Sequence, residues 1–89
     1  MKIDIDFFSD SNTDPTIEMR ETMAKAKVGN EAAGEDPTVN ELVSEVCDLL
    51  GKPAGIFLPS GTMCNVIAYK AQVEMPGDYI IMDETSHPL

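Results

Sequence analysis

The chain has 89 residues, 43% of them hydrophobic, and its 16 acidic and 6 basic residues give a formal net charge of −10. This length allows at most one small domain, and the acidic balance argues against binding to nucleic acid or to an anionic membrane. No apolar run approaches the roughly 18 residues that a membrane-spanning helix needs, and the acidic start does not resemble a signal peptide, so we expect a cytoplasmic protein.

The chain is expected to open with a short extended segment over residues 3–7, where apolar residues alternate with aspartates. Residues 9–15 should form an irregular loop, because they are rich in side chains that bond to their own backbone. Thr16 can then cap a helix that begins at about Ile17 and ends before Gly29.

A second helix is the most strongly patterned element. Residues 29–35 lack a helical period and are expected to link the two helices. Asp36 suits the N-cap, Pro37 suits the first helical position, and Gly51 stands where the C-terminus needs positive φ. The apolar positions recur at the three-and-four spacing of a helix face: Val39, Leu42, Val43, Val46, Leu49 and Leu50.

The pattern in the last third of the chain predicts a strand, a helix and a second strand. Residues 54–58 and 79–82 are apolar runs of strand length, and a helical pattern follows the Ser60-Gly61-Thr62 turn between them. This order predicts a parallel βαβ unit with a right-handed crossover. Ligands of such sheets bind beyond the carboxyl ends of the strands, where Ser60 and residues 83–87 both fall.

The turn formed by Ser60, Gly61 and Thr62 predicts an anion site. Amides at a helix start lack intrahelical acceptors, the helix dipole favours negative charge there, and two hydroxyls can donate. An ordinary capped strand-to-helix turn is the alternative that this tripeptide leaves open. The turn matches neither the Walker A nor the GxGxxG pattern.

Two further positions are candidates for chemistry. His87, the only histidine, follows the second apolar run and could stack on a planar ligand or exchange a proton, although a structural or exposed histidine stays possible. Ser9 belongs to a hydroxyl-rich loop that could reach a ligand carboxylate or could be a simple turn. One histidine without further ligands predicts no metal site, and Cys47 and Cys64 are expected to be buried, reduced thiols.

Three separated strings resemble the amino-terminal part of the threonine aldolases: residues 5–10 (IDFFSD), 34–42 (GEDPTVNEL) and 59–65 (PSGTMCN). These are pyridoxal-phosphate enzymes of the aspartate aminotransferase fold, fold type I, in the β-eliminating lyase branch. The resemblance covers essentially the whole chain and implies an α/β fold class. Residues 1–14 would be an N-terminal arm and loop, and residues 15–89 the incomplete start of the large domain that binds pyridoxal phosphate.

The resemblance also implies roles for the candidate residues. The turn at Ser60, Gly61 and Thr62 would hold the cofactor phosphate through backbone amides and a hydroxyl. His87 would stack on the pyridine ring and assist proton transfer from the substrate β-hydroxyl, and Ser9 would help to bind the substrate carboxylate. The implied reaction is retro-aldol cleavage of L-threonine or L-allo-threonine, a small amino-acid substrate, to glycine and acetaldehyde. The implied assembly is a homo-oligomer, usually a tetramer.

The chain departs from the family at two positions, with Phe8 in place of an arginine and Ala33 in place of a tyrosine. An aldolase for another β-hydroxy amino acid, or another pyridoxal-phosphate lyase or racemase, is therefore an alternative. In the family, the lysine that binds the cofactor covalently lies beyond position 89. We expect an amino-terminal segment that is inactive without the remainder of its polypeptide. A non-catalytic assembly module is a further alternative, because strands with unpaired edges and apolar helix faces need a partner.

Overall fold

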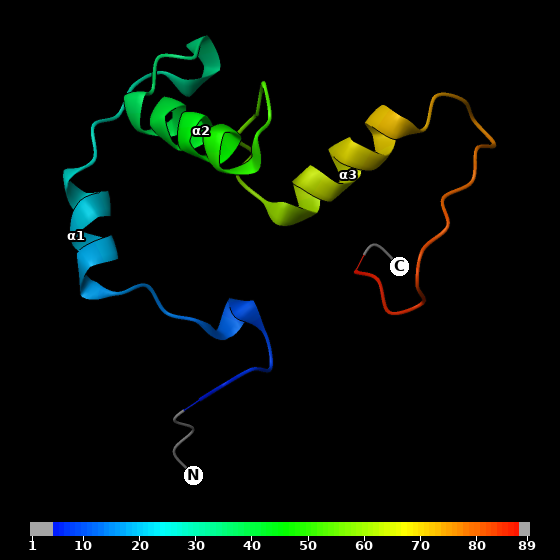
Figure 1. Cartoon of the computed structure of the whole chain (residues 1–89), viewed down its shortest axis with the longest axis horizontal. Coiled ribbons are helices and arrows are strands. Elements are labelled where there is room, and N and C mark those ends of the chain that lie inside the picture. Colours follow the sequence, from blue (N-terminus) through cyan, green and yellow to red (C-terminus); the bar gives the residue numbers. More distant parts are fainter. Residues whose placement is uncertain (1–4, 88–89) are drawn as a thin grey trace. The chain divides into compact units, whose positions relative to one another are not determined.

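The computed structural model describes residues 5–87, which contain α-helices and short 3-10 turns joined by loops (Figure 1). The elements are η1 (Asp10–Asn12), α1 (Ile17–Lys25), η2 (Glu31–Ala33), α2 (Pro37–Leu50) and α3 (Gly61–Gln72). Contacts within the chain group it into two units, Met1–Leu42 and Val43–Leu89, which are described separately below. Among the described residues, no helix is long and apolar enough to cross a membrane.

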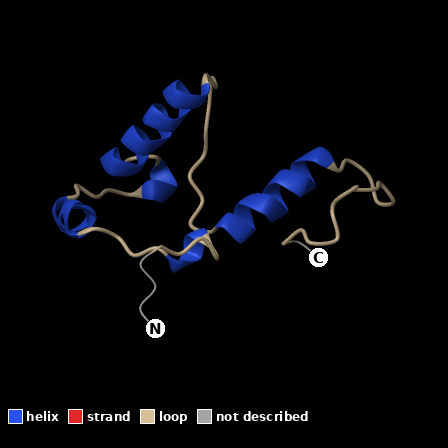
Figure 2. Ribbon diagram, turned by 60° about the horizontal axis from the view of Figure 1, so that its bottom comes forward, coloured by secondary structure: helices blue, strands red, loops and turns tan. Residues whose placement is uncertain are grey.

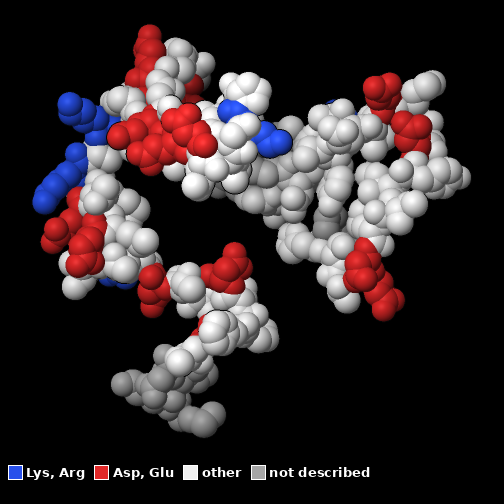
Figure 3. All heavy atoms as spheres, in the orientation of Figure 1, with Lys and Arg blue, Asp and Glu red and all other residues white. Residues whose placement is uncertain are grey.

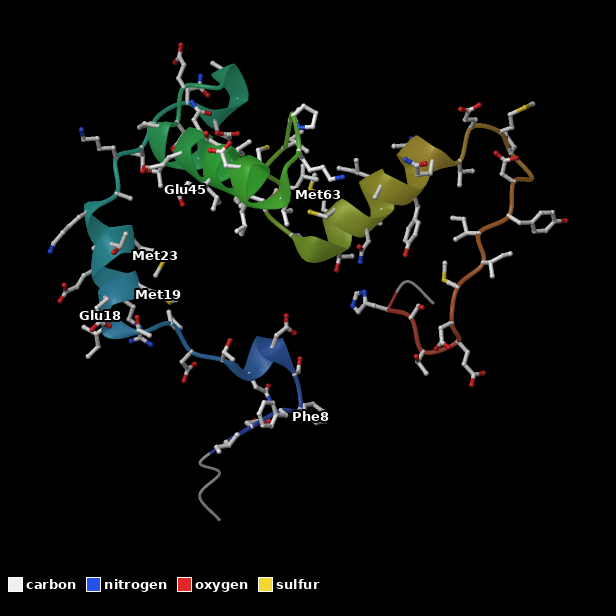
Figure 4. All side chains as sticks on the ribbon, in the orientation of Figure 1. Phe8, Glu18, Met19, Met23, Glu45 and Met63 are labelled. Carbon is white, nitrogen blue, oxygen red and sulfur yellow. The ribbon has the colours of Figure 1, made fainter. Side chains whose placement is uncertain are left out.

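Helix α1 begins where its sequence predicts. The Thr16 side chain accepts a hydrogen bond from the Met19 amide at 3.2 Å, which satisfies one of the unpaired donors of the first turn. Glu18 in the first turn and Lys25 in the last turn both suit the helix dipole. Met19 and Met23 project from the same side of α1 and remain exposed (Figure 4).

Helix α2 has the predicted signals at both ends. Asp36 accepts a hydrogen bond from the Val39 amide at 3.0 Å, and Pro37 is the first helical residue. Gly51 has φ 63°, its amide donates to the Asp48 carbonyl, and the Lys52 amide donates to the Cys47 carbonyl at 2.9 Å. These two backbone bonds form a Schellman motif, which ends the helix at Leu50.

The segment that follows α2 returns along its C-terminal half. A Cβ atom added at Gly55 would lie 3.0 Å from the Cys47 sulfur and 3.4 Å from a Val43 methyl carbon. Gly55 therefore packs against α2 at a distance that a larger residue could not keep without a shift of the Cys47 side chain. This contact lies wholly within the unit Val43–Leu89.

The predicted strands are not formed in the described part of the chain, where Figure 2 shows helix and loop only. Residues 54–58 and 79–82 lie in loops, as do residues 5–7 of the expected first extended segment; positions 3 and 4 of that segment lie outside the described residues. A strand needs a neighbour to pair its amides and carbonyls, and neither run has one within residues 5–87. The βαβ unit stays a prediction.

Burial is almost entirely absent from residues 5–87. No apolar side chain is buried, and the sole buried side chain in this range is Asp36, which is 9% exposed. Val39 and Val43 of the predicted α2 face are half-buried, whereas Leu49 is 83% exposed. The described residues therefore form helices without a hydrophobic core.

The expectation of two buried thiols is wrong. Cys47 is half-buried, because the Gly55 backbone lies against it, but Cys64 is exposed. Cys64 lies in the first turns of α3, where no described residue of the unit Val43–Leu89 covers it. The sequence placed Cys64 on a helix correctly, but burial depends on contacts that these residues do not make.

Candidate functional site

The turn at residues 60–62 has the geometry of a capped helix start. Ser60 is extended (φ −146°, ψ 135°), and α3 begins at Gly61. The Ser60 hydroxyl oxygen accepts from the Met63 amide at 3.4 Å, and the Ser60 carbonyl accepts from the Cys64 amide at 3.0 Å. The amides of Gly61 and Thr62 precede the first intrahelical bond and so have no acceptor within the helix. The turn is thus the capped helix start that the sequence left open as the alternative, and anion binding by the two amides without an intrahelical acceptor stays a prediction.

The surroundings of the turn suit a phosphate. The side chains of Ser60 and Thr62 are exposed, and a Cβ atom added at Gly61 would meet nothing within 4 Å. The first turn of α3 holds no acidic residue that would compete with an anion. The Ser60 oxygen accepts from Met63 and still has its own proton to donate. The residues present therefore fit the phosphate group of the cofactor that the resemblance implies.

The charge of the whole chain opposes anion binding. Acidic side chains are more widespread than basic ones on the face shown in Figure 3, in agreement with the formal charge of −10. Only short-range donors can overcome this repulsion, and backbone amides at a helix start act at short range. The turn does not need a basic side chain if its two amides and its hydroxyls contact the phosphate directly.

His87 lies just after a hydrogen-bonded turn. The Asp83 carboxylate accepts bonds from the hydroxyl of Thr85 and from its amide, the latter at 2.8 Å, and the Ser86 amide donates to the Asp83 carbonyl at 3.0 Å. The bond from the Thr85 hydroxyl, followed by that from its amide, lowers the pKa of the Asp83 carboxyl, and desolvation opposes this shift. His87 is exposed. No hydrogen bond between described residues joins it to the 60–62 turn, so their meeting at one site stays a prediction.

Ser9 uses its hydroxyl locally. It caps η1 by accepting from the Ser11 amide at 3.2 Å, and its oxygen lies 2.8 Å from the Ser11 hydroxyl oxygen. This is the turn that the sequence left open as the alternative reading. Phe8, which precedes Ser9 and is labelled in Figure 4, is 88% exposed. A role for Ser9 toward a substrate carboxylate stays a prediction.

Asp36 makes a contact that the sequence did not indicate. Its second carboxylate oxygen accepts from the Gly29 amide at 3.0 Å, in addition to the predicted cap on Val39. The bond from Val39, followed by that from Gly29, lowers the pKa of the Asp36 carboxyl, and desolvation opposes this shift. The seven-residue separation hides the contact from local patterns. The one available signal was Gly29 itself, because a glycine permits close backbone approach.

An open groove lies in the unit Met1–Leu42. It is lined by Thr22, Lys25, Ala26, Lys27, Pro37, Thr38 and Glu41. Its lysines and its glutamate belong to a solvent-facing surface. No group of three or more metal-ligating side chains was found among the described residues.

Comparisons with known proteins decide the family. The model of the beta-eliminating lyase family matches residues 6–89. The chain belongs to the beta-eliminating lyase family. Its members are lyases that use pyridoxal phosphate on a type I fold, so the coarser expectations of fold class and of enzyme class are confirmed at the level of the family.

Curated relatives confirm the resemblance to threonine aldolases. The chain is 44% identical over 77 residues to the low specificity L-threonine aldolase of Escherichia coli K12, covering 86% of this chain and 23% of that protein. It is 41% identical over 83 residues to "Probable low-specificity L-threonine aldolase 2" of Arabidopsis thaliana, covering 93% of this chain and 23% of that protein. It is 38% identical over 82 residues to the low specificity L-threonine aldolase of Saccharomyces cerevisiae, covering 92% and 21%. The chain thus spans less than a quarter of the length of these relatives. No solved structure was found to match it.

Proposed function

We propose that the chain supplies the phosphate-binding turn of a pyridoxal-phosphate-dependent aldolase that cleaves L-threonine or L-allo-threonine to glycine and acetaldehyde. The observation that carries the proposal is the start of α3, where the amides of Gly61 and Thr62 have no helical acceptor and no acidic side chain competes for them. The relatives named L-threonine aldolases support the choice of substrate.

The roles of the turn follow from its hydrogen bonds. The amides of Gly61 and Thr62 donate to phosphate oxygens, and the Ser60 hydroxyl donates its proton while its oxygen keeps the cap on Met63. The Thr62 hydroxyl is a fourth donor. Since Gly61 has open space where a side chain would stand, the phosphate can approach the backbone closely.

Two residues complete the proposed chemistry. When bound, pyridoxal phosphate acts as the electron sink for breaking the substrate carbon–carbon bond. The His87 imidazole would stack on the cofactor ring and take the proton of the substrate β-hydroxyl, the role that the family resemblance implies for it. The Ser9 hydroxyl donates to the carboxylate of the amino-acid substrate.

We propose further that these 89 residues need the remainder of their polypeptide and function as a homo-oligomer. None of the five lysines occupies a position that matches the cofactor lysine of the family: Lys2, Lys25, Lys27, Lys52 and Lys70. Residues 54–58 and 79–82 would become paired parallel strands once neighbouring strands are supplied, which would complete the βαβ unit. The absence of buried apolar side chains from residues 5–87 supports this dependence.

Two other functions are favoured by particular observations. Phe8 and Ala33 stand where the family usually has polar side chains, which favours a different β-hydroxy amino acid or a different reaction of the same cofactor, by a lyase or a racemase. The exposed apolar side chains of α1 and α2 favour a non-catalytic assembly module. An aldolase for a different β-hydroxy amino acid predicts release of glycine from that substrate in preference to L-threonine, whereas another lyase, a racemase or a non-catalytic module predicts no release of glycine from either.

A chimera tests the proposal. The matching 77-residue segment of the Escherichia coli relative is replaced by this chain, and release of glycine from L-threonine is measured for the chimera, for the unchanged relative and for the 89 residues alone. We expect turnover by the first two and none by the third. Turnover by the 89 residues alone, or a folded chimera that binds pyridoxal phosphate but releases no glycine from L-threonine or L-allo-threonine, would contradict the proposed function.

A further inference from the structure

Asp36 joins a loop to a helix through one carboxylate. Its two oxygens accept one amide each, from Gly29 and from Val39, both at 3.0 Å. The Val39 bond caps α2, whereas the Gly29 bond reaches back across the connection between α1 and α2. We call these two bonds the Asp36 bridge. It involves the only buried side chain among the described residues.

The loop closed by the Asp36 bridge is held by further polar bonds. The backbone bonds run from the Gly34 amide to the Glu31 carbonyl and from the Glu35 amide to the Asn30 carbonyl, both at 2.9 Å. Two side chains bond to loop carbonyls: the Thr38 hydroxyl to Lys27 at 2.6 Å and the Asn40 amide to Gly34 at 2.9 Å. Residues 27–40 thus form a continuous hydrogen-bonded unit.

The loop is also fitted sterically. A Cβ atom added at Gly29 would lie 2.2 Å from the Glu35 carbonyl oxygen and 2.8 Å from its carbon, distances that no real side chain can accept. Gly34 has φ 70°, which a glycine adopts without strain. The path of the backbone therefore favours glycine at both positions.

Hydrophobic packing contributes little to this conformation. Val28 is 84% exposed and Val39 is half-buried, so no apolar side chain of residues 27–40 is buried. The neighbouring ionisable side chains, those of Lys27, Glu31 and Glu35, are exposed as well. Asp36 is the one buried group, and its carboxylate accepts hydrogen bonds from backbone amides.

We propose that the Asp36 bridge fixes residues 27–40 in one conformation without any hydrophobic core, so that η2 is held in a set geometry relative to the first turn of α2. The loop is then ordered in the 89-residue chain by itself, before the apolar helix faces find partners. The bridge does not depend on the function proposed for the 60–62 turn, since it lies wholly within the unit Met1–Leu42.

The substitution Asp36→Asn separates the two halves of the bridge. Asparagine caps helices as well as aspartate does, but it has one acceptor oxygen in place of two. In the 89-residue chain, amide hydrogen exchange measured by NMR should show a Gly29 amide that is protected in the unchanged chain. In Asp36→Asn this amide should exchange about tenfold faster, while mid-helix amides such as that of Val43 keep their rates. Asp14→Asn, at an exposed aspartate outside the loop, is the matched control and should change neither the exchange rate of the Gly29 amide nor that of the Val43 amide.

A second variant changes the residue whose amide donates to Asp36. Gly29→Ala places a methyl group against the Glu35 carbonyl and should expose the Gly29-position and Glu35 amides while the cap on Val39 persists. Three results would overturn the proposal: an unprotected Gly29 amide in the unchanged chain, unchanged Gly29 exchange in Asp36→Asn, or loss of loop and helix protection together. The last result would reduce Asp36 to a helix cap.

Discussion

At the scale of single residues, the charge of Asp36 has the clearest consequence. The amides of Val39 and Gly29 bond to its carboxylate and hold its pKa below the ordinary value of an aspartate. A group whose pKa is depressed by folding contributes stability that is complete above its unfolded pKa and is lost as the pH falls through the folded pKa. The Asp36 bridge should therefore contribute its full stability at neutral pH and lose it as the pH falls through the depressed pKa of Asp36.

This pH dependence can be measured directly. The Gly29 amide and the Asp36 side-chain carboxyl should titrate together in NMR spectra of the 89-residue chain, at a pH below that of an aspartate in an unfolded peptide. In Asp36→Asn the Gly29 amide should lose this acid transition. A Gly29 resonance that titrates identically in both chains would show that another group controls the loop.

The residue-scale features that the sequence predicted are all local. Thr16 and Asp36 cap their helices as expected, and Ser60 forms the cap that the sequence left open as an alternative, because a cap depends only on the next three residues. The burial of Cys64 was predicted wrongly, and the bond from Gly29 to Asp36 was missed, because both depend on residues distant in the sequence. For the same reason, it stays a prediction that Ser9, Ser60 and His87 share one site, because the local geometry of each residue does not test it.

At the scale of elements, helices and strands differ in how much context they require. The three α-helices follow their predicted ranges, since a helix closes its hydrogen bonds within its own segment. Residues 54–58 and 79–82 have the composition of strands but no partner among the described residues, so they lie in loops. The pattern therefore predicted which segments are apolar, whereas strand formation requires neighbours.

Two glycines at helix ends should respond to alanine in opposite ways. Gly51 has φ 63°, and an alanine there would cost about 1 kcal/mol of backbone strain, with no clash to add to it. Gly61 begins α3 without positive φ, so an alanine there should strengthen the helix, by less than the ~1 kcal/mol of a helix interior. Circular dichroism of the 89-residue chain should show less helix for Gly51→Ala and slightly more for Gly61→Ala; equal changes of one sign would refute this account of the α2 C-terminus.

At the scale of the whole molecule, the missing core determines stability. No apolar side chain is buried in residues 5–87, and cooperative unfolding depends on such burial. We expect the helix signal of the 89-residue chain to decline gradually on heating, without a sharp transition, and an apolar dye to bind at low temperature. A sharp calorimetric transition in the isolated chain would show instead that these residues form a core of their own.

Binding of the cofactor phosphate at the start of α3 can be tested with the substitution Ser60→Asp in the chimera with the Escherichia coli relative. Aspartate caps a helix as well as serine does, so α3 is preserved, but its negative charge repels a phosphate at the Gly61 and Thr62 amides. The dissociation constants of pyridoxal phosphate and of pyridoxal, which lacks the phosphate, are measured for the chimera with Ser60 and for the chimera with Ser60→Asp. We expect the constant for pyridoxal phosphate to rise by about a hundredfold and that for pyridoxal to change by about twofold or less. Unchanged affinity for pyridoxal phosphate in Ser60→Asp would contradict phosphate binding at the start of α3.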